Sequence, residues 1–171
     1  MTLIVTVGAS TSDSYATLAE AEAYMATLIF KTEWTAATDP IKEAALKQAA
    51  RLMNNLGWVG TRYAQDQALA WPRCQGYTSR GVAEDYVYDA DGWPVYWDTI
   101  PVCVKNAQAE FAFRLLAEDR SQDAGSLAPE TVKIGSLEVG KRKHKIYPDS
   151  VISMISQFLA SRPGCIQGVR G

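Results

Sequence analysis

Residues 100–118 constrain the fold of this chain more than any other segment. Pro101 suits the first turn of a helix, where a backbone N–H has no helical partner in any case. At about 100° per residue, two separate apolar stripes follow. They are Val104, Ala107, Phe111 and Leu115 on one side, and Val102, Ala109, Phe113 and Leu116 on the other. A surface helix needs only one stripe, so this pattern predicts a helix at the centre of a bundle or at a contact between subunits.

The composition predicts one folded domain. The chain has 171 residues, of which 47% are hydrophobic and 21% are charged, and this balance excludes wholesale disorder. We expect residues 1–162 to form a single domain and residues 163–171, which lack periodicity, to form a flexible C-terminal arm. The sequence has no run of about 18 apolar residues, so we expect no membrane span. The first residues lack the features of a signal peptide.

Three further helices are expected around the central one. Thr17 and Glu20 form a capping-box pattern before a helix that ends near residue 28. Asp39 and Pro40 begin a second helix that ends near residue 56. A last helix covers residues 148–161. Trp34 is expected in a loop. Residues 57–73 have neither helix nor strand period, although their two tryptophans should pack onto the helices.

Two segments have strand character. Residues 77–98 predict an inserted β-hairpin, with arms at 82–88 and 93–97 around an Asp-Ala-Asp-Gly turn. Residues 131–139 alternate as a strand or a short hairpin. The predicted fold class is therefore mainly α: a helical bundle of about four helices with an inserted β-hairpin, a short β segment and an extended C-terminal arm.

The predicted hairpin is crowded with aromatic residues. They are Tyr77, Tyr86, Tyr88, Trp93, Tyr96 and Trp97. Aromatic side chains at this density can stack nucleic-acid bases, but five acidic residues in the same segment would repel phosphate. The composition therefore favours a hairpin that packs on itself or on protein. Tyr88, Trp93 and Trp97 are our candidates here for a subunit interface or a DNA channel.

Charge is distributed unevenly along the chain. Residues 61–130 carry eleven acidic and six basic residues, whereas residues 131–171 carry two acidic and seven basic ones. Opposite charges of this kind suit head-to-tail contact between copies or contact with a charged partner; an uneven solvated surface is the alternative. The basic run Lys141, Arg142, Lys143 and Lys145 is a second interface or channel candidate. It would contact phosphate or an acidic partner, or remain a solvated loop.

The inventory of reactive residues argues against an enzyme. His144 is the only histidine and lies within the basic run. The sequence contains no glycine-rich phosphate loop, zinc-ligand spacing or nucleophile elbow. Asp89 and Asp91 match only part of a calcium loop. Cys74, Cys103 and Cys165 are widely spaced, as expected for reduced thiols of an intracellular protein. We therefore expect no catalytic residue, no metal and no cofactor.

Several motifs together resemble a known family. They are SYATLAEAEAYM, KEAALKQAARLMNNLGW, GTR, ALAWPR, and IP followed by VKNAQAEFAFRLLA. In this order they resemble the small head–tail connector, or adaptor, proteins of tailed bacteriophages, a family that also carries the label DnaT-like single-stranded-DNA-binding protein. The resemblance covers residues 14–118, with weaker similarity in KIGSLEV and in the helix after Tyr147-Pro148. The hairpin at 77–98 is longer than the family pattern.

The resemblance implies a structural protein of the virion, made in the host cytoplasm. Such adaptors have a helical core and form a homo-oligomeric ring, typically a dodecamer, beneath the portal protein. They join it to the neck or tail-completion (stopper) protein, and double-stranded DNA passes through the channel without sequence specificity. Their C-terminal segment reaches into the portal, which makes Ile166, Val169 and Arg170 candidate portal contacts. The family's second label implies an alternative, a single-stranded-DNA-binding replication protein. The isoelectric point of about 5.4 counts against this alternative, and the basic run supports it.

Overall fold

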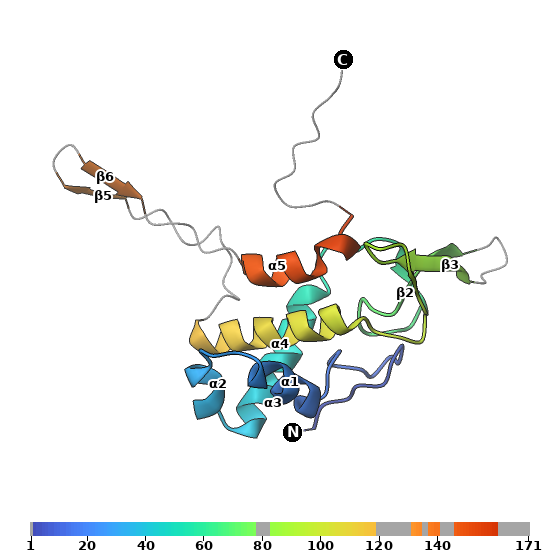
Figure 1. Ribbon diagram of the computed structural model, residues 1–171, viewed down its shortest axis with the longest axis horizontal. Coiled ribbons are helices and arrows are strands. Elements are labelled where there is room, and N and C mark those ends of the chain that lie inside the picture. The colour runs from blue at the N-terminus through green and yellow to red at the C-terminus, as the bar shows by residue number, and fades with distance from the viewer. Residues whose placement is uncertain (1, 78–82, 119–130, 135–136, 141–145, 161–171) are drawn as a thin grey trace, which may run out of the picture.

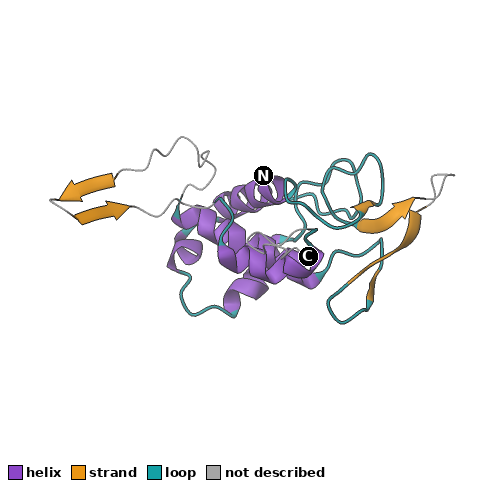
Figure 2. Cartoon of the chain, turned by 90° about the horizontal axis from the view of Figure 1, so that it is seen from above, coloured by secondary structure: helices purple, strands orange, loops and turns teal. Residues whose placement is uncertain are grey.

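The computed structural model describes residues 2–77, 83–118, 131–134, 137–140 and 146–160. Within these ranges, five α-helices form the body of the molecule, and a four-stranded antiparallel sheet lies beyond one end of the central helix (Figures 1 and 2). The predicted fold class, mainly α with an inserted β segment, is confirmed. The predicted C-terminal arm, residues 163–171, lies outside the described residues.

The helices follow the predicted order with one addition. They are α1 (Leu18–Ala26), α2 (Thr32–Ala36), α3 (Asp39–Met53), α4 (Val102–Ala117) and α5 (Asp149–Ile155), the last continued by a 3₁₀ turn, η1 (Ser156–Phe158). The expected loop around Trp34 is wrong, because this residue lies in α2. A five-residue helix is too short to show a 3.6-residue period. Its Trp34 ring is buried, with the Lys42 ammonium 5.5 Å from the ring centroid.

The central helix is α4, as its two stripes predict. It packs against α1, α2, α3 and α5, and Val104, Ala107 and Phe111 are fully buried. On the second stripe Ala109 and Phe113 are buried. Val102, the first residue of α4, is 70% exposed, so the second stripe is covered only beyond the first turn.

Helices α1 and α3 begin close to the positions that their capping residues predict. Thr17 caps α1, and its reciprocal bonds with Glu20 form the complete capping box. The N-cap of α3 is Thr38 rather than Asp39, with Pro40 in the first turn. The helix ends at Met53, a few residues earlier than predicted.

The predicted hairpin is present but is not a separate insertion. Its strands β3 (Ala83–Tyr88) and β4 (Pro94–Val95) join around a turn in which Gly92 has φ +84°. However, β3 also pairs with β2 (Arg73–Tyr77), and β2 pairs with β1 (Thr61–Arg62). The sheet order is β1-β2-β3-β4. Because β1 is only two residues long and β2 contains a glycine and several polar residues, neither shows the alternation that marks a half-buried strand.

Both tryptophans of residues 57–73 pack onto the helices, as predicted. The Trp71 ring is 1% exposed and makes edge contacts with Trp58, at 5.8 Å between centroids, and with Phe158, at 4.9 Å. The Trp71-Pro72 peptide bond is cis. Trp58 Nε1 donates to the Met53 carbonyl at 2.9 Å. These contacts join the segment after α3 to the end of the last helix.

The second β segment is confirmed as a short antiparallel pair, β5 (Thr131–Ile134) with β6 (Leu137–Gly140). Among the helices that the structure describes, none is both long and apolar enough to cross a membrane.

Candidate functional site

The sheet carries a stack of three aromatic rings. The Trp97 ring lies nearly parallel to Tyr63, at 5.8 Å and 7°, and to Tyr86, at 5.0 Å and 4°. Tyr96 meets Tyr86 edge-on at 5.1 Å. Trp97 is half-buried, and its ring already stacks with two tyrosine rings, which leaves less of it for a nucleic-acid base.

The other aromatic candidates are exposed. Trp93 is 71% exposed, Tyr96 56% and Tyr88 42%. They lie on β3, at the turn and beside β4, close to the exposed carboxylates of Asp91 and Asp98. This acidic setting is the one the composition predicts, and it disfavours direct contact with phosphate.

The turn itself is held rigidly. Asp89 Oδ1 accepts hydrogen bonds from the backbone N–H groups of Asp91 and Trp93, at 3.0 and 2.8 Å. The Ala90 N–H donates to Gln157 Oε1 at 2.9 Å, which ties the turn to η1. The exposed aromatic side chains are therefore presented on a fixed support.

An open groove lies at the β1–β2 edge. It has a volume of about 650 Å³ and is lined by Gly60, Thr61, Arg62, Tyr63, Ala64, Gln65 and Arg73. We call it the β1 groove. Arg62 and Arg73 face each other across the strand pair, so two positive charges meet here. Tyr63 belongs both to this groove and to the aromatic stack.

Arg73 is buried, with 8% of its surface exposed. Its Nε donates to the Val59 carbonyl at 2.6 Å, Nη1 donates to the Ala70 carbonyl at 3.0 Å, and Nη2 donates to the Gly60 carbonyl. All three of these acceptors are backbone carbonyl groups. Burial lowers the pKa of this guanidinium, and the like charge of Arg62 lowers it further.

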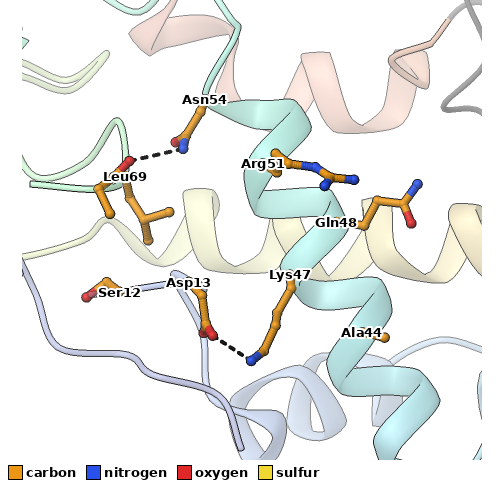
Figure 3. Close-up of a pocket in the computed structure, with 9 residues that line it drawn as sticks. Ser12, Asp13, Ala44, Lys47, Gln48, Arg51, Asn54 and Leu69 are labelled. Carbon is orange, nitrogen blue, oxygen red and sulfur yellow. Dashed lines mark hydrogen bonds and ion pairs between the residues drawn. The ribbon is translucent and has the colours of Figure 1, made fainter. Parts of the chain in front are cut away.

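A second groove, of about 450 Å³, lies between the N-terminal segment and α3 (Figure 3). Its Lys47 points toward Asp13, with 2.5 Å between Nζ and Oδ2, whereas Arg51 and Gln48 extend from another side of the helix. Asp13 therefore neutralises the charge of Lys47 in this groove.

A buried polar network holds the β1 groove in place from the core. Gln108 of α4 is fully buried and bonds to the backbone around Tyr15. The Tyr15 hydroxyl donates to Asn54 Oδ1 at 2.6 Å and accepts from the Ala70 N–H at 3.2 Å. Ala70 in turn accepts from Arg73. Burial raises the pKa of Tyr15 well above its ordinary value, so this phenol stays protonated and keeps its donor.

Large apolar residues are exposed at the other end of the molecule. Ile29 and Phe30, between α1 and α2, are 88% and 86% exposed. In Figure 1, α2 lies near the C-terminal end of α4 and the sheet lies beyond the N-terminal end. The exposed Ile29–Phe30 pair and the exposed aromatic residues of the sheet therefore occupy different ends.

The remaining candidates from the sequence fall outside the described residues. They are Lys141, Arg142, Lys143 and Lys145 of the basic run, with His144, and the portal-contact candidates Ile166, Val169 and Arg170. In the ranges that are described, no cluster of three or more histidine, cysteine, aspartate or glutamate side chains is arranged to hold a metal ion.

The sequence reasoning missed Arg73 and Gln108. Each is polar and lies in a segment without an obvious site motif. Arg73 could have been identified from the ALAWPR segment, which it ends. An arginine directly after buried apolar residues needs several hydrogen-bond acceptors nearby.

Comparison with known proteins gives one match. A family model described as "Putative DnaT-like ssDNA binding protein" matches residues 1–167. No curated protein and no solved structure matches the chain significantly.

Proposed function

The chain belongs to the family of DnaT-like ssDNA-binding proteins, and on this premise we propose that it is a structural protein of a tailed bacteriophage and not an enzyme. Following the resemblance of its motifs to head–tail adaptors, it forms a homo-oligomeric ring under the portal protein. The ring joins the portal to the neck or stopper protein, and double-stranded DNA passes through it. Its location is then the head–tail interface of the virion, after synthesis in the bacterial cytoplasm.

One observation carries the self-assembly part of this proposal. Ile29 and Phe30 are exposed at the α2 end, and Trp93 and Tyr96 are exposed at the sheet end. Burying apolar surface contributes about 25 cal/mol per Å², so side chains as large as these favour contact with protein.

The two patches also differ from each other, which restricts the symmetry of the contact. A two-fold contact centred on either patch would pair that patch with its own copy and leave the other patch exposed. A head-to-tail contact brings the two different patches together, and it closes into a ring if the rotation between copies allows. This arrangement is the one that an adaptor ring requires.

The test is assembly on the portal. The purified chain is mixed with its portal protein, and the mass of the complex is measured by analytical ultracentrifugation and its shape by cryo-electron microscopy. Phe30→Ser should reduce the ring occupancy on the portal, whereas Val7→Ser, at a 41% exposed position in the N-terminal segment, is the matched control. If Phe30→Ser assembles as well as the control, the exposed pair does not support the ring.

A single-stranded-DNA-binding protein is the second candidate. The observation that favours it is the β1 groove, where Arg62 and Arg73 lie beside the aromatic stack. The acidic residues around Trp93 oppose it. Tight binding of a single-stranded oligonucleotide at physiological salt, without association with the portal, would favour this candidate over the adaptor.

A further inference from the structure

The N-terminal segment has strong strand character but belongs to neither of the sheets that the structure describes. Four of the five residues 3–7 are β-branched, which favours an extended backbone. Burial alternates along residues 2–6, where Leu3 and Val5 are half-buried and the residues on either side of them are exposed. A period of two residues is that of a β-strand, so residues 2–6 form an extended segment.

One edge of this segment is bonded to the body of the protein. The Ile4 N–H donates to Asp13 Oδ1 at 2.8 Å, and the Ile4 carbonyl accepts from the Asp13 N–H at 3.0 Å. The Thr6 carbonyl accepts from a backbone N–H of the turn that follows. The Thr2 carbonyl accepts from Lys47 Nζ at 3.1 Å. These bonds all use residues 2, 4 and 6, which share one edge of an extended chain.

The opposite edge has no partner among the described residues. Peptide groups of alternate residues in a strand point to opposite edges, so those of Leu3 and Val5 point away from the bonded edge. Neither residue donates or accepts a backbone hydrogen bond within the ranges that the structure describes. Beside them, Ile4 leaves 43% of its surface exposed. An unpaired strand edge next to exposed apolar surface is a template for a further strand.

The pair of strands β5 and β6 also lacks a neighbour. The two strands bond to each other as a two-stranded sheet, and no helix or further strand of the described chain packs extensively against them. An isolated two-stranded hairpin is at best marginally stable in water, whereas three strands with an apolar face can be stable. The β5–β6 pair therefore needs the kind of partner that the free edge of residues 2–6 provides.

The two elements lie at different ends of the molecule. In Figures 1 and 2 the β5–β6 pair lies beyond the C-terminal end of α4, whereas the segment before α1 extends toward the sheet end. The sixteen residues of α4, about 24 Å of helix, separate these ends. A head-to-tail contact brings the α2 end of one copy to the sheet end of the next, so the β5–β6 pair of one copy comes near residues 2–6 of its neighbour.

We propose that the β5–β6 pair of one copy adds to the free edge of residues 2–6 in the next copy and forms a three-stranded sheet between subunits. This inference deepens the proposed function and rests on its head-to-tail assembly. Main-chain hydrogen bonds provide the affinity in strand addition of this kind. Leu3 and Val5 together contribute two N–H donors and two carbonyl acceptors. The sheet is a backbone contact in addition to the apolar contact of Ile29 and Phe30.

Hydrogen exchange, measured by mass spectrometry with single-residue fragmentation, tests the contact on the full chain. Exchange rates are compared between the dilute free chain and the chain assembled on its portal protein. The N–H groups of Leu3 and Val5 should exchange at least about tenfold more slowly in the assembly. The Asp13 N–H, which already donates to Ile4, is the internal control and should change little. Assembly on the portal with unchanged rates at Leu3 and Val5 would overturn this inference alone and leave the adaptor function standing.

Paired variants test which two elements meet. Val5→Pro removes the N–H that an added strand needs, and it breaks no hydrogen bond among the described residues. Val5→Thr keeps the N–H and the β-branched shape and is the matched control. A second variant replaces residues 131–140 by glycine and serine residues of equal number. Analytical ultracentrifugation measures association of the chain alone, at a concentration at which the wild type associates.

The mixture of these variants gives the decisive result. Val5→Pro and the 131–140 variant should each associate less than wild type, whereas Val5→Thr should associate normally. Mixed together, they should recover a one-to-one pair, because the intact β5–β6 pair of one meets the intact edge of the other. No recovery in the mixture would overturn the proposal. A wild-type chain that associates neither with itself nor on the portal would instead remove the proposed function, and this inference with it.

Discussion

Replacement of Gln108 should destabilise this protein more than replacement of any other polar residue of α4. Its side chain is fully buried, and all of its hydrogen-bonding capacity is used. Oε1 accepts from the Tyr15 and Ala16 N–H groups at 3.0 and 2.9 Å. Nε2 donates to Ser14 Oγ and to the Leu46 carbonyl, both at 2.8 Å. A single side chain therefore joins α4 to α3 and to the segment before α1.

The magnitude follows from the groups that would lose a partner. In Gln108→Ala, two backbone N–H groups and one carbonyl remain buried without these bonds, and each costs about 1–3 kcal/mol. The missing side chain also leaves a cavity. Allowing for partial relaxation, we expect a loss of about 3–5 kcal/mol. This is a large part of the stability of about 5–15 kcal/mol that is typical of a folded domain.

The assay is equilibrium unfolding in urea, followed by far-ultraviolet circular dichroism, for wild type and Gln108→Ala. The matched control is Asn106→Ala, which removes a similar amide from the same helix at a half-buried position and should cost less than about 1 kcal/mol. If Gln108→Ala costs no more than the control, the network does not hold the N-terminal segment to α4, and the reasoning is wrong.

Three further predictions concern stability, each measured by the same unfolding assay. Gly60→Ala should cost about 3 kcal/mol or more, because Gly60 has φ +67° and an added Cβ would clash with the backbone carbonyl oxygen of Cys74 in β2. Gly57→Ala has open space around the added Cβ and should be nearly neutral. Thr17→Ala should cost about 0.5–2 kcal/mol by removing the capping box of α1; an unchanged midpoint would contradict this. The hydrogen bond from Lys42 lowers the pKa of Glu22 below its ordinary value of 4.5. The ionised Glu22 therefore contributes its full stabilisation above pH 4.5 and loses it as the pH falls through the lowered pKa. Glu22→Gln should lose less stability on acidification than wild type, and an equal loss would refute the assignment.

The main helices were predictable because their signals are local. The two stripes of α4 and the Thr17–Glu20 box depend on residues within one or a few turns of each other. The hairpin turn at Gly92 was predictable for the same reason, since four consecutive residues define it. The capping position at Thr38 instead of Asp39 shows how local signals still misplace an element's end by one residue.

The candidate site was harder to predict from the sequence, because its interactions join residues that are far apart in the chain. Gln108 bonds to residues more than ninety positions earlier in the chain, and no periodicity reports such contacts. Arg73 lies in a strand without an alternating pattern. The three carbonyl groups that accept its hydrogen bonds lie in segments outside the helices and strands. Sequence reasoning instead selected the aromatic hairpin residues, whose density is visible in the composition. The structure shows that the Trp97 ring stacks with two tyrosine rings, a contact that the density of aromatic residues in the sequence cannot reveal.

Cryo-electron microscopy of the chain mixed with its portal protein, with the chain alone as control, is the decisive test of the proposed adaptor ring. We predict a ring stacked on the portal, in which the α2 end of one copy contacts the sheet end of the next. Folded protein that does not associate with an intact portal would contradict the claim.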